Sequence, residues 1–184
     1  MIKKILVLSI LVFFINKTYV KADFMIMKLK SGEVEIELYA DLAPKHVERI
    51  KLLTEQKKYD GVVFHRVIDG FMAQTGDVQY GKSDSENYDL SLAGTGGSEL
   101  PDLKAEFSNT AHEKGTLSMA RSGDPNSANS QFFICFESAP HLDRQYTAFG
   151  KVVKGMEFID LIKKGEGSNG SVSDPDKIIS LTLK

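Results

Sequence analysis

The chain has 184 residues, of which 42% are hydrophobic and 26% are charged, with a formal net charge of −2. These values describe one ordinary domain that is large enough to bury a core, and no composition shift marks a second domain. The slight acidic excess argues against nucleic acid as the main partner, because binding to a phosphate backbone needs a basic surface.

The N-terminal 22 residues have the pattern of a secretory signal peptide. Lys3 and Lys4 precede an apolar run over residues 5–15, and residues 20–22 (VKA) resemble a cleavage site. At about 1.5 Å per residue the apolar run covers roughly 17 Å, whereas the hydrocarbon core of a bilayer is about 30 Å thick. The sequence therefore predicts cleavage after Ala22. An uncleaved anchor and a buried N-terminal helix are the alternatives.

Cleavage would leave a domain of residues 23–184 with more acidic than basic residues. It removes four lysines and no acidic residue, so 19 basic residues remain against 25 acidic ones. The single cysteine, Cys135, lies in the apolar run FFICF and cannot form an internal disulfide bond. We therefore expect an exported protein, periplasmic or secreted, that depends on its core for stability and carries a buried, inert thiol.

The domain begins with a predicted β-hairpin. Residues 25–30 and 33–39 flank a Ser31-Gly32 turn, and apolar and acidic residues alternate in the second run. A helix is then expected from Pro44 to about Lys58, because proline is tolerated in the first turn of a helix.

The rest of the chain is predicted to be mainly β. A second helical stretch covers residues 156–164. Six further strand-like runs lie at residues 62–68, 71–75, 115–120, 131–136, 148–153 and 177–184. Short strands at both ends and two helices predict a closed eight-stranded antiparallel β-barrel capped by two α-helices. A long irregular segment, residues 79–100, is of the length that is often functional.

One motif match is misleading. Residues 76–83 (GDVQYGKS) fit the phosphate-loop pattern, but the residues that follow show no helical period, and a phosphate loop must open a helix. The Gly94–Gly97 run is more typical of a tight backbone path than of an anion site. The four histidines are scattered, without metal-ligand spacing. We therefore predict no cofactor and no metal.

Two ordered clusters carry the functional information. The first is residues 64–77, FHRVIDGFMAQTGD. The second is residues 118–134, with SMARS and NSANSQFFI, followed by HLD at 141–143 and FGKV at 149–152. These clusters resemble the signatures FHR-x-x-x-GFM-x-Q-x-GD and NGSQFFI of the cyclophilin family. The resemblance extends from the first hairpin to the last strand, and it implies the cyclophilin fold and peptidyl-prolyl cis-trans isomerase activity.

Without the resemblance, the residues of the two clusters allow simpler structural interpretations. Strand alternation predicts that Phe64 and Arg66 share one face, with His65 and Val67 on the other. Arg66 could then be a rim arginine whose stem covers apolar surface. Gln74 and Gln131 could be ordinary solvent-facing residues, and the apolar residues of the clusters could be ordinary core.

The resemblance assigns roles to these residues. Arg66 is the expected catalytic donor, and Gln74 is expected to donate to the turning carbonyl. The expected substrate-binding residues are Phe71, Met72, Ala120, Arg121, Gln131, Phe133, His141, Leu142 and Tyr146. Among them, Phe71, Met72, Phe133 and Leu142 would hold the proline ring. The backbone of Arg121, with Gln131, would pair with an extended substrate.

The sequence also departs from the family pattern. Arg121 stands where asparagine is frequent, and Tyr146 stands where many eukaryotic members have histidine. His141 replaces the usual tryptophan, which in the family donates to cyclosporin A, so weak binding of that drug is expected. The segment 79–97 is longer than in compact members and could form a lid or an extra subsite.

The expected partners are proline-containing polypeptides, in unfolded or extended segments. The enzyme is expected to assist their folding and to be a monomer. A non-catalytic proline-binding chaperone module is the alternative function. Arg66 and Gln74 argue against it, because a binding module needs neither.

Overall fold

The computed structural model describes residues 23–184, and the predicted signal peptide lies outside these residues. The chain forms one eight-stranded antiparallel sheet, two α-helices and one turn of 3-10 helix. The strands are β1 (Asp23–Lys28), β2 (Glu33–Leu38), β3 (Arg66–Ile68), β4 (Met72–Thr75), β5 (Thr116–Met119), β6 (Phe132–Cys135), β7 (Ala148–Lys154) and β8 (Ser180–Leu183). The helices are α1 (Pro44–Glu55), α2 (Met156–Asp160) and the 3-10 turn Pro140–Leu142.

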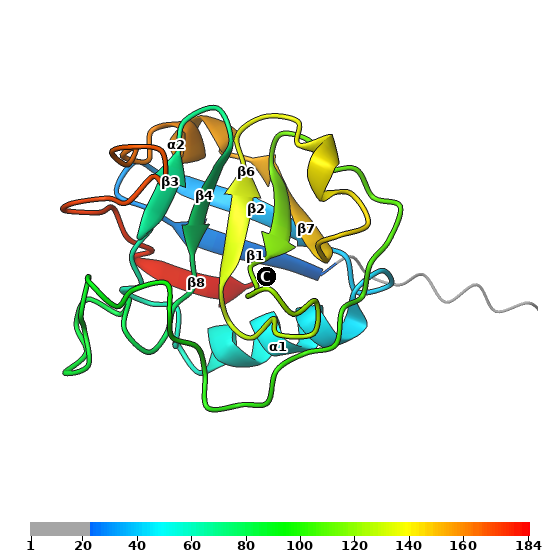
Figure 1. Ribbon diagram of the computed structural model, residues 1–184, viewed down its shortest axis with the longest axis horizontal. Helices are drawn as coiled ribbons and strands as arrows, with labels where there is room; N and C mark the ends of the chain where they lie inside the picture. Colours follow the sequence, from blue (N-terminus) through cyan, green and yellow to red (C-terminus); the bar gives the residue numbers. More distant parts are fainter. Residues whose placement is uncertain (1–22) are drawn as a thin grey trace, which may run out of the picture.

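The sheet curls around a single core, with the strand order β3-β4-β6-β5-β7-β2-β1-β8. Figure 1 shows β3, β4 and β6 in front of β8, β1 and β2, with α1 and α2 at opposite ends. The mainly β prediction is confirmed. Closure of the barrel is not confirmed, because no strand ladder joins β3 to β8 in the described residues. Isolated bridges nearby, such as Val63 to Lys177, span this gap.

The predicted hairpin and first helix follow from local sequence. Leu29 and Gly32 exchange backbone hydrogen bonds of 2.9 and 3.3 Å across the turn, so β1 and β2 pair directly. Helix α1 starts at Pro44 and buries Val47, Ile50 and Leu53 against the core. Most of the segment after β4 is irregular up to β5, as predicted for residues 79–100.

The predicted faces of the residues around Arg66 agree with the structure for Val67 but not for Phe64. Val67 points into the core as the alternation predicts, but Phe64 also lies in the core cluster, away from Arg66. The reason is that the regular strand begins only at Arg66, so the alternation does not extend back to Phe64. Arg66 is therefore on the outer face of the sheet, opposite the core.

His65 is buried beside this strand without a polar partner. It is 7% exposed, and neither ring nitrogen has a hydrogen-bond partner within residues 23–184. Burial lowers the pKa of His65 from 6.5 to about 4; the Asp77 carboxylate opposes this shift, and the charge of Arg66 adds to it. The folded protein therefore holds His65 neutral at pH values where the unfolded chain protonates it.

This difference predicts a pH-dependent stability. Between pH 6.5 and pH 4 the unfolded chain binds more protons at His65, so the free energy of unfolding falls as the pH falls. The shift in the pKa of His65 corresponds to about 3 kcal/mol. We expect urea unfolding of the His65→Leu variant to lose about that much less stability than the parent over this range. Parallel pH profiles of the two proteins would contradict the prediction, because they would show that His65 takes up its proton over the same pH range in the folded and unfolded states.

Candidate functional site

The outer face of β3, β4, β6 and β5 carries one row of residues at matching positions. Arg66 pairs with Gln74, Gln74 with Phe133, and Phe133 with Ser118 in the strand registers. Because side chains alternate between the two faces of a strand, all four point to the same side of the sheet. The main core occupies the other side of the sheet, so this row faces away from it.

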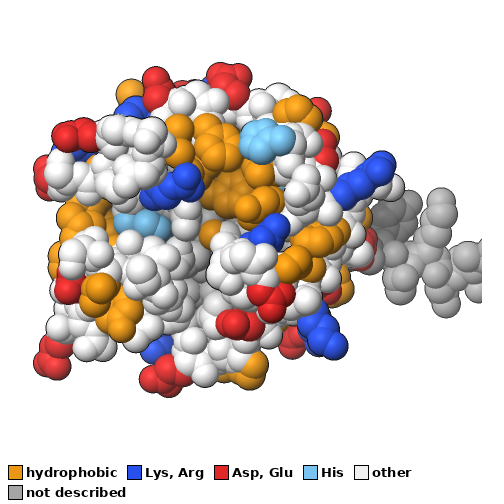
Figure 2. All heavy atoms as spheres, in the orientation of Figure 1, with side chains coloured by type: hydrophobic (Ala, Val, Ile, Leu, Met, Phe, Trp, Pro, Cys, Tyr) orange, Lys and Arg blue, Asp and Glu red, His pale blue; other side chains and the backbone are white. Residues whose placement is uncertain are grey.

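An apolar pocket lies beside this row. Figure 2 shows hydrophobic side chains at the floor of a hollow over β4 and β6, with basic side chains on both sides. The buried members are Met72, Phe133, Cys135, Ala139 and Leu142, and the partly buried ones are Ile68, Phe71, Ala120 and Tyr146. The structure thus brings together the four residues expected to hold the proline ring, Phe71, Met72, Phe133 and Leu142, and places Ala120 and Tyr146 of the wider expected substrate site beside them.

The pocket floor contains no reactive thiol. Cys135 is fully buried, and burial raises the pKa of its thiol to about 12. The thiol therefore stays protonated at neutral pH, as expected for an inert cysteine.

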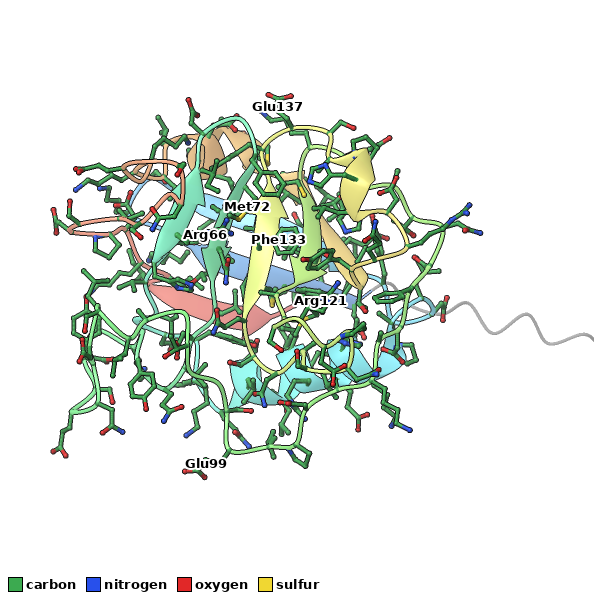
Figure 3. The ribbon with its side chains drawn as sticks, in the orientation of Figure 1. Arg66, Met72, Glu99, Arg121, Phe133 and Glu137 are labelled. Atoms are coloured by element: carbon green, nitrogen blue, oxygen red, sulfur yellow. The ribbon has the colours of Figure 1, made fainter. Side chains whose placement is uncertain are left out.

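Arg66 lies at the edge of the pocket, as Figure 3 shows beside Met72 and Phe133. Its Nη1 donates to Oε1 of Gln74 at 3.2 Å, and its Nε donates to the carbonyl oxygen of Asn169 at 2.8 Å. These two bonds fix the plane of the guanidinium group. No motif marks Asn169, which lies in a loop 103 residues further along the chain.

Gln131 connects the predicted catalytic pair to a distant loop. Its Oε1 accepts a hydrogen bond from Nε2 of Gln74 at 3.0 Å, and its Nε2 donates to the carbonyl of Gly96 at 2.7 Å. The backbone N–H of Ala120 donates to the carbonyl of Gln131 at 2.9 Å. Gln74 and Gln131 are therefore not free solvent-facing amides, since each is held by its neighbours.

Arg121 flanks the opposite side of the pocket from Arg66 (Figure 3). Its guanidinium carbon lies 4.3 Å from the centroid of the Tyr146 ring, and its Nη2 donates to the carbonyl of Gln145 at 3.0 Å. The Tyr146 ring in turn meets Phe133 edge to face at 5.8 Å. The side chain of Arg121 is thus engaged with the protein itself and braces the aromatic wall.

His141 stands on the rim, in the 3-10 turn. Its side chain is exposed, and its ring centroid lies 5.5 Å from that of Phe71 with a tilt of 37°. The imidazole therefore extends the wall of the pocket without closing it.

A buried polar group behind Phe133 was not predicted. Nδ1 of His112 lies 2.9 Å from Oδ1 of Asp143, and Nε2 of His112 lies 3.0 Å from Oγ of Ser118. The His112 ring stacks on Phe133 with centroids 6.4 Å apart. Ser118 is fully buried, so this Ser-His-Asp arrangement has no access to a substrate and supports the pocket from behind.

A groove of about 440 Å³ adjoins the pocket. It is lined by Gln74, residues 94–98, Asp102, Ala120, Arg121, Ser122, Ser127, Asn129 and Gln131. Because it shares Gln74, Ala120, Arg121 and Gln131 with the site, it offers polar contacts to a chain that leaves the apolar pocket.

The phosphate-loop match has no structural support. Residues 76–83 follow β4 but open no helix, and Lys82 binds the carbonyl of Asp60 and lies 3.3 Å from the Asp84 carboxylate. Within residues 23–184, no group of three His, Cys, Asp or Glu side chains is placed to hold a metal, and no helix is long and apolar enough to span a membrane.

Comparison with known proteins agrees with the geometry. The family model described as "Cyclophilin type peptidyl-prolyl cis-trans isomerase/CLD" matches residues 24–183. A "Probable peptidyl-prolyl cis-trans isomerase" of Brucella suis is 58% identical over 161 residues, 87% of this chain and 82% of the relative.

Solved structures show the same fold. The cyclophilin AquaCyp293 from Hirschia baltica aligns with a TM-score of 0.71 and 26% identity, covering 86% of this chain and 73% of that one. A cyclophilin-type isomerase of Cryptosporidium parvum, determined in the presence of the dipeptide Ala-Pro, aligns with a TM-score of 0.73 and 25% identity, covering 88% and 98%. By its motifs, its outer-face site and its relatives, the chain belongs to the cyclophilin-type peptidyl-prolyl cis-trans isomerases.

Proposed function

We propose that this isomerase acts outside the cytoplasm on proline-containing segments of exported proteins, with Arg66 as the catalytic donor and Gln74 as its partner. The observation that carries the assignment of Arg66 is its position: a guanidinium group held by Gln74 and Asn169 at the edge of an apolar pocket. The resemblance of residues 64–77 to the family signature supports the same role.

The chemistry needs only a well-placed donor. Resonance holds the prolyl amide planar with a barrier of about 18–20 kcal/mol. At the twisted transition state the prolyl nitrogen loses conjugation and gains a lone pair. A hydrogen bond from Arg66 to this lone pair stabilises the transition state and not the planar ground state, which is the condition for catalysis. No covalent bond breaks, so no nucleophile is required.

The pocket holds one side of the bond while the other side turns. The proline ring would rest on Met72, Phe133 and Leu142, with Phe71 packed against them. A proline-containing ligand is consistent with the Cryptosporidium parvum relative, whose structure was determined in the presence of Ala-Pro.

The substrate carbonyl would turn beside Gln74. The Nε2 amide of Gln74 donates one hydrogen to Gln131. The second hydrogen of the same amide would donate to the turning carbonyl. The groove beside Arg121 would receive the extended substrate chain.

The export assignment rests on residues 1–22 and predicts the first residue of the working protein. The basic head and short apolar run favour cleavage after Ala22. Mass spectrometry of the protein isolated from its native host should show Asp23 as the first residue. The same sample should accelerate cis-to-trans isomerisation of an Ala-Pro peptide in a protease-coupled assay. Recovery of membrane-free protein that retains Met1 would contradict export by this route, whereas an inactive but folded sample would contradict the proposed catalytic site.

A further inference from the structure

The carboxylate of Asp77 is fully buried and accepts four backbone hydrogen bonds from two segments of the chain. Its Oδ1 accepts from the N–H groups of Gln79 and Tyr80 at 3.0 and 2.9 Å, which fixes the turn after β4. Its Oδ2 accepts from the N–H groups of Gly94 and Gly96 at 2.7 and 2.9 Å. One oxygen therefore holds its own turn, and the other holds a loop 17 to 19 residues further along.

The loop of residues 94–97 approaches the Asp77 carboxylate closely only because positions 94 and 96 are glycines. A Cβ on Gly96 would lie 2.7 Å from Oδ1 of Asp77, and a Cβ on Gly94 would lie 2.8 Å from the ring of His65. Gly94 also has φ of +101°, which favours glycine. The close contact is thus specific to this sequence of loop residues.

This loop in turn holds the side chains of the site through the carbonyl of Gly96. The carbonyl of Gly96 accepts from Nε2 of Gln131, Oε1 of Gln131 accepts from Nε2 of Gln74, and Oε1 of Gln74 accepts from Nη1 of Arg66. Each amide has one donor end and one acceptor end, so the Gly96 carbonyl decides which way both amides face. It is this orientation that leaves the oxygen of Gln74 toward Arg66.

We propose that Asp77 is a positioning residue for the isomerase reaction. Its carboxylate holds Gly96 in place, and the Gly96 carbonyl orients Gln131, Gln74 and finally the guanidinium group of Arg66. Asp77 does not touch the substrate; it acts through a continuous series of hydrogen bonds that begins in the protein interior. This inference rests on the proposed role of Arg66 as the catalytic donor.

The substitution Asp77→Asn tests the proposal with almost no change in side-chain volume. The asparagine oxygen can keep one pair of N–H partners, but its NH₂ group then faces the other pair, donor against donor. We expect kcat/KM for an Ala-Pro peptide to fall about tenfold or more, because a small displacement of a catalytic group has a large effect on rate. We expect the affinity for the same peptide, measured by titration, to change less than threefold, because the apolar pocket is untouched.

A double-mutant cycle separates positioning from general destabilisation. If Asp77 acts through Gln131, the Asp77→Asn change should have little further effect on kcat/KM in a Gln131→Ala background. Gly96→Ala provides a second route to the same displacement without altering charge, and it should show the same non-additivity. Gly123→Ala is the matched control, since a Cβ on Gly123 meets nothing within 4 Å.

The possible outcomes are distinct. Non-additive losses for both Asp77→Asn and Gly96→Ala with Gln131→Ala support the proposal. Fully multiplicative losses, or parent-like kcat/KM in folded Asp77→Asn, overturn it. If Asp77→Asn does not fold, the cycle with Gly96→Ala decides. An Arg66→Ala arm is run in parallel: parent-like activity in that variant would overturn the catalytic role of Arg66 itself, independently of the result for Asp77.

Discussion

Replacing Arg66 by alanine is expected to lower kcat/KM by at least about a hundredfold, which corresponds to roughly 2.7 kcal/mol of transition-state stabilisation. The reason is that the guanidinium group is the charged donor at the edge of the apolar pocket on the Gln74 side, and the prolyl nitrogen needs a donor only when the amide is twisted. The fold should persist, because Arg66 lies on the outer face of β3 and contributes nothing to the barrel core. A protease-coupled assay at several peptide concentrations measures the effect.

The matched control for this variant removes an arginine elsewhere. Arg144 is exposed and has φ of +59°, a conformation that asparagine tolerates, so Arg144→Asn removes one positive charge without disturbing the site. We expect this control to retain the parent rate. If Arg66→Ala is folded and isomerises X-Pro bonds as fast as the control, the proposed mechanism is wrong.

Cyclosporin A is expected to bind the parent weakly and to bind the His141→Trp variant about 30- to 150-fold more tightly. The imidazole of His141 lies on the exposed rim, 5.5 Å from the ring of Phe71, where a tryptophan would add apolar area and an indole donor. A hydrogen bond of about 1 kcal/mol plus some tens of Å² at about 25 cal/mol per Å² gives roughly 2–3 kcal/mol.

Inhibition titrations of the parent and the variant measure this difference. Isomerase activity without the drug serves as the control and should be similar in both proteins, since His141 and Arg66 are held by separate contacts. Nanomolar inhibition of the parent, or no gain in the tryptophan variant, would show that position 141 does not limit drug binding.

The sequence predicted the regular elements well where the pattern is local. Alternation in residues 33–39 and the proline at position 44 each depend on neighbours a few positions away, and the structure shows the hairpin and helix there. The motif residues were assigned by resemblance, and the structure places Arg66, Gln74 and Gln131 in one network.

The contacts that the sequence did not predict join distant segments. Asn169 reaches Arg66 from a loop without a motif, and Gly96 reaches Gln131 because a buried carboxylate holds its loop. Periodicity carries no information about such loop placements. The expected face of Phe64 was wrong for a related reason, because alternation fails where a strand has not yet begun.

The division of the apolar residues into two clusters on opposite faces of the sheet has a consequence for evolution. The pocket residues Met72, Phe133 and Leu142 belong to one cluster, and the barrel interior belongs to the other. Changes at the partly buried pocket residues, such as Phe71 and Tyr146, leave the interior filled, so they carry less of the cavity penalty that core substitutions incur. Substrate preference can therefore change at these rim positions with a smaller effect on the folding free energy than substitutions in the interior would have.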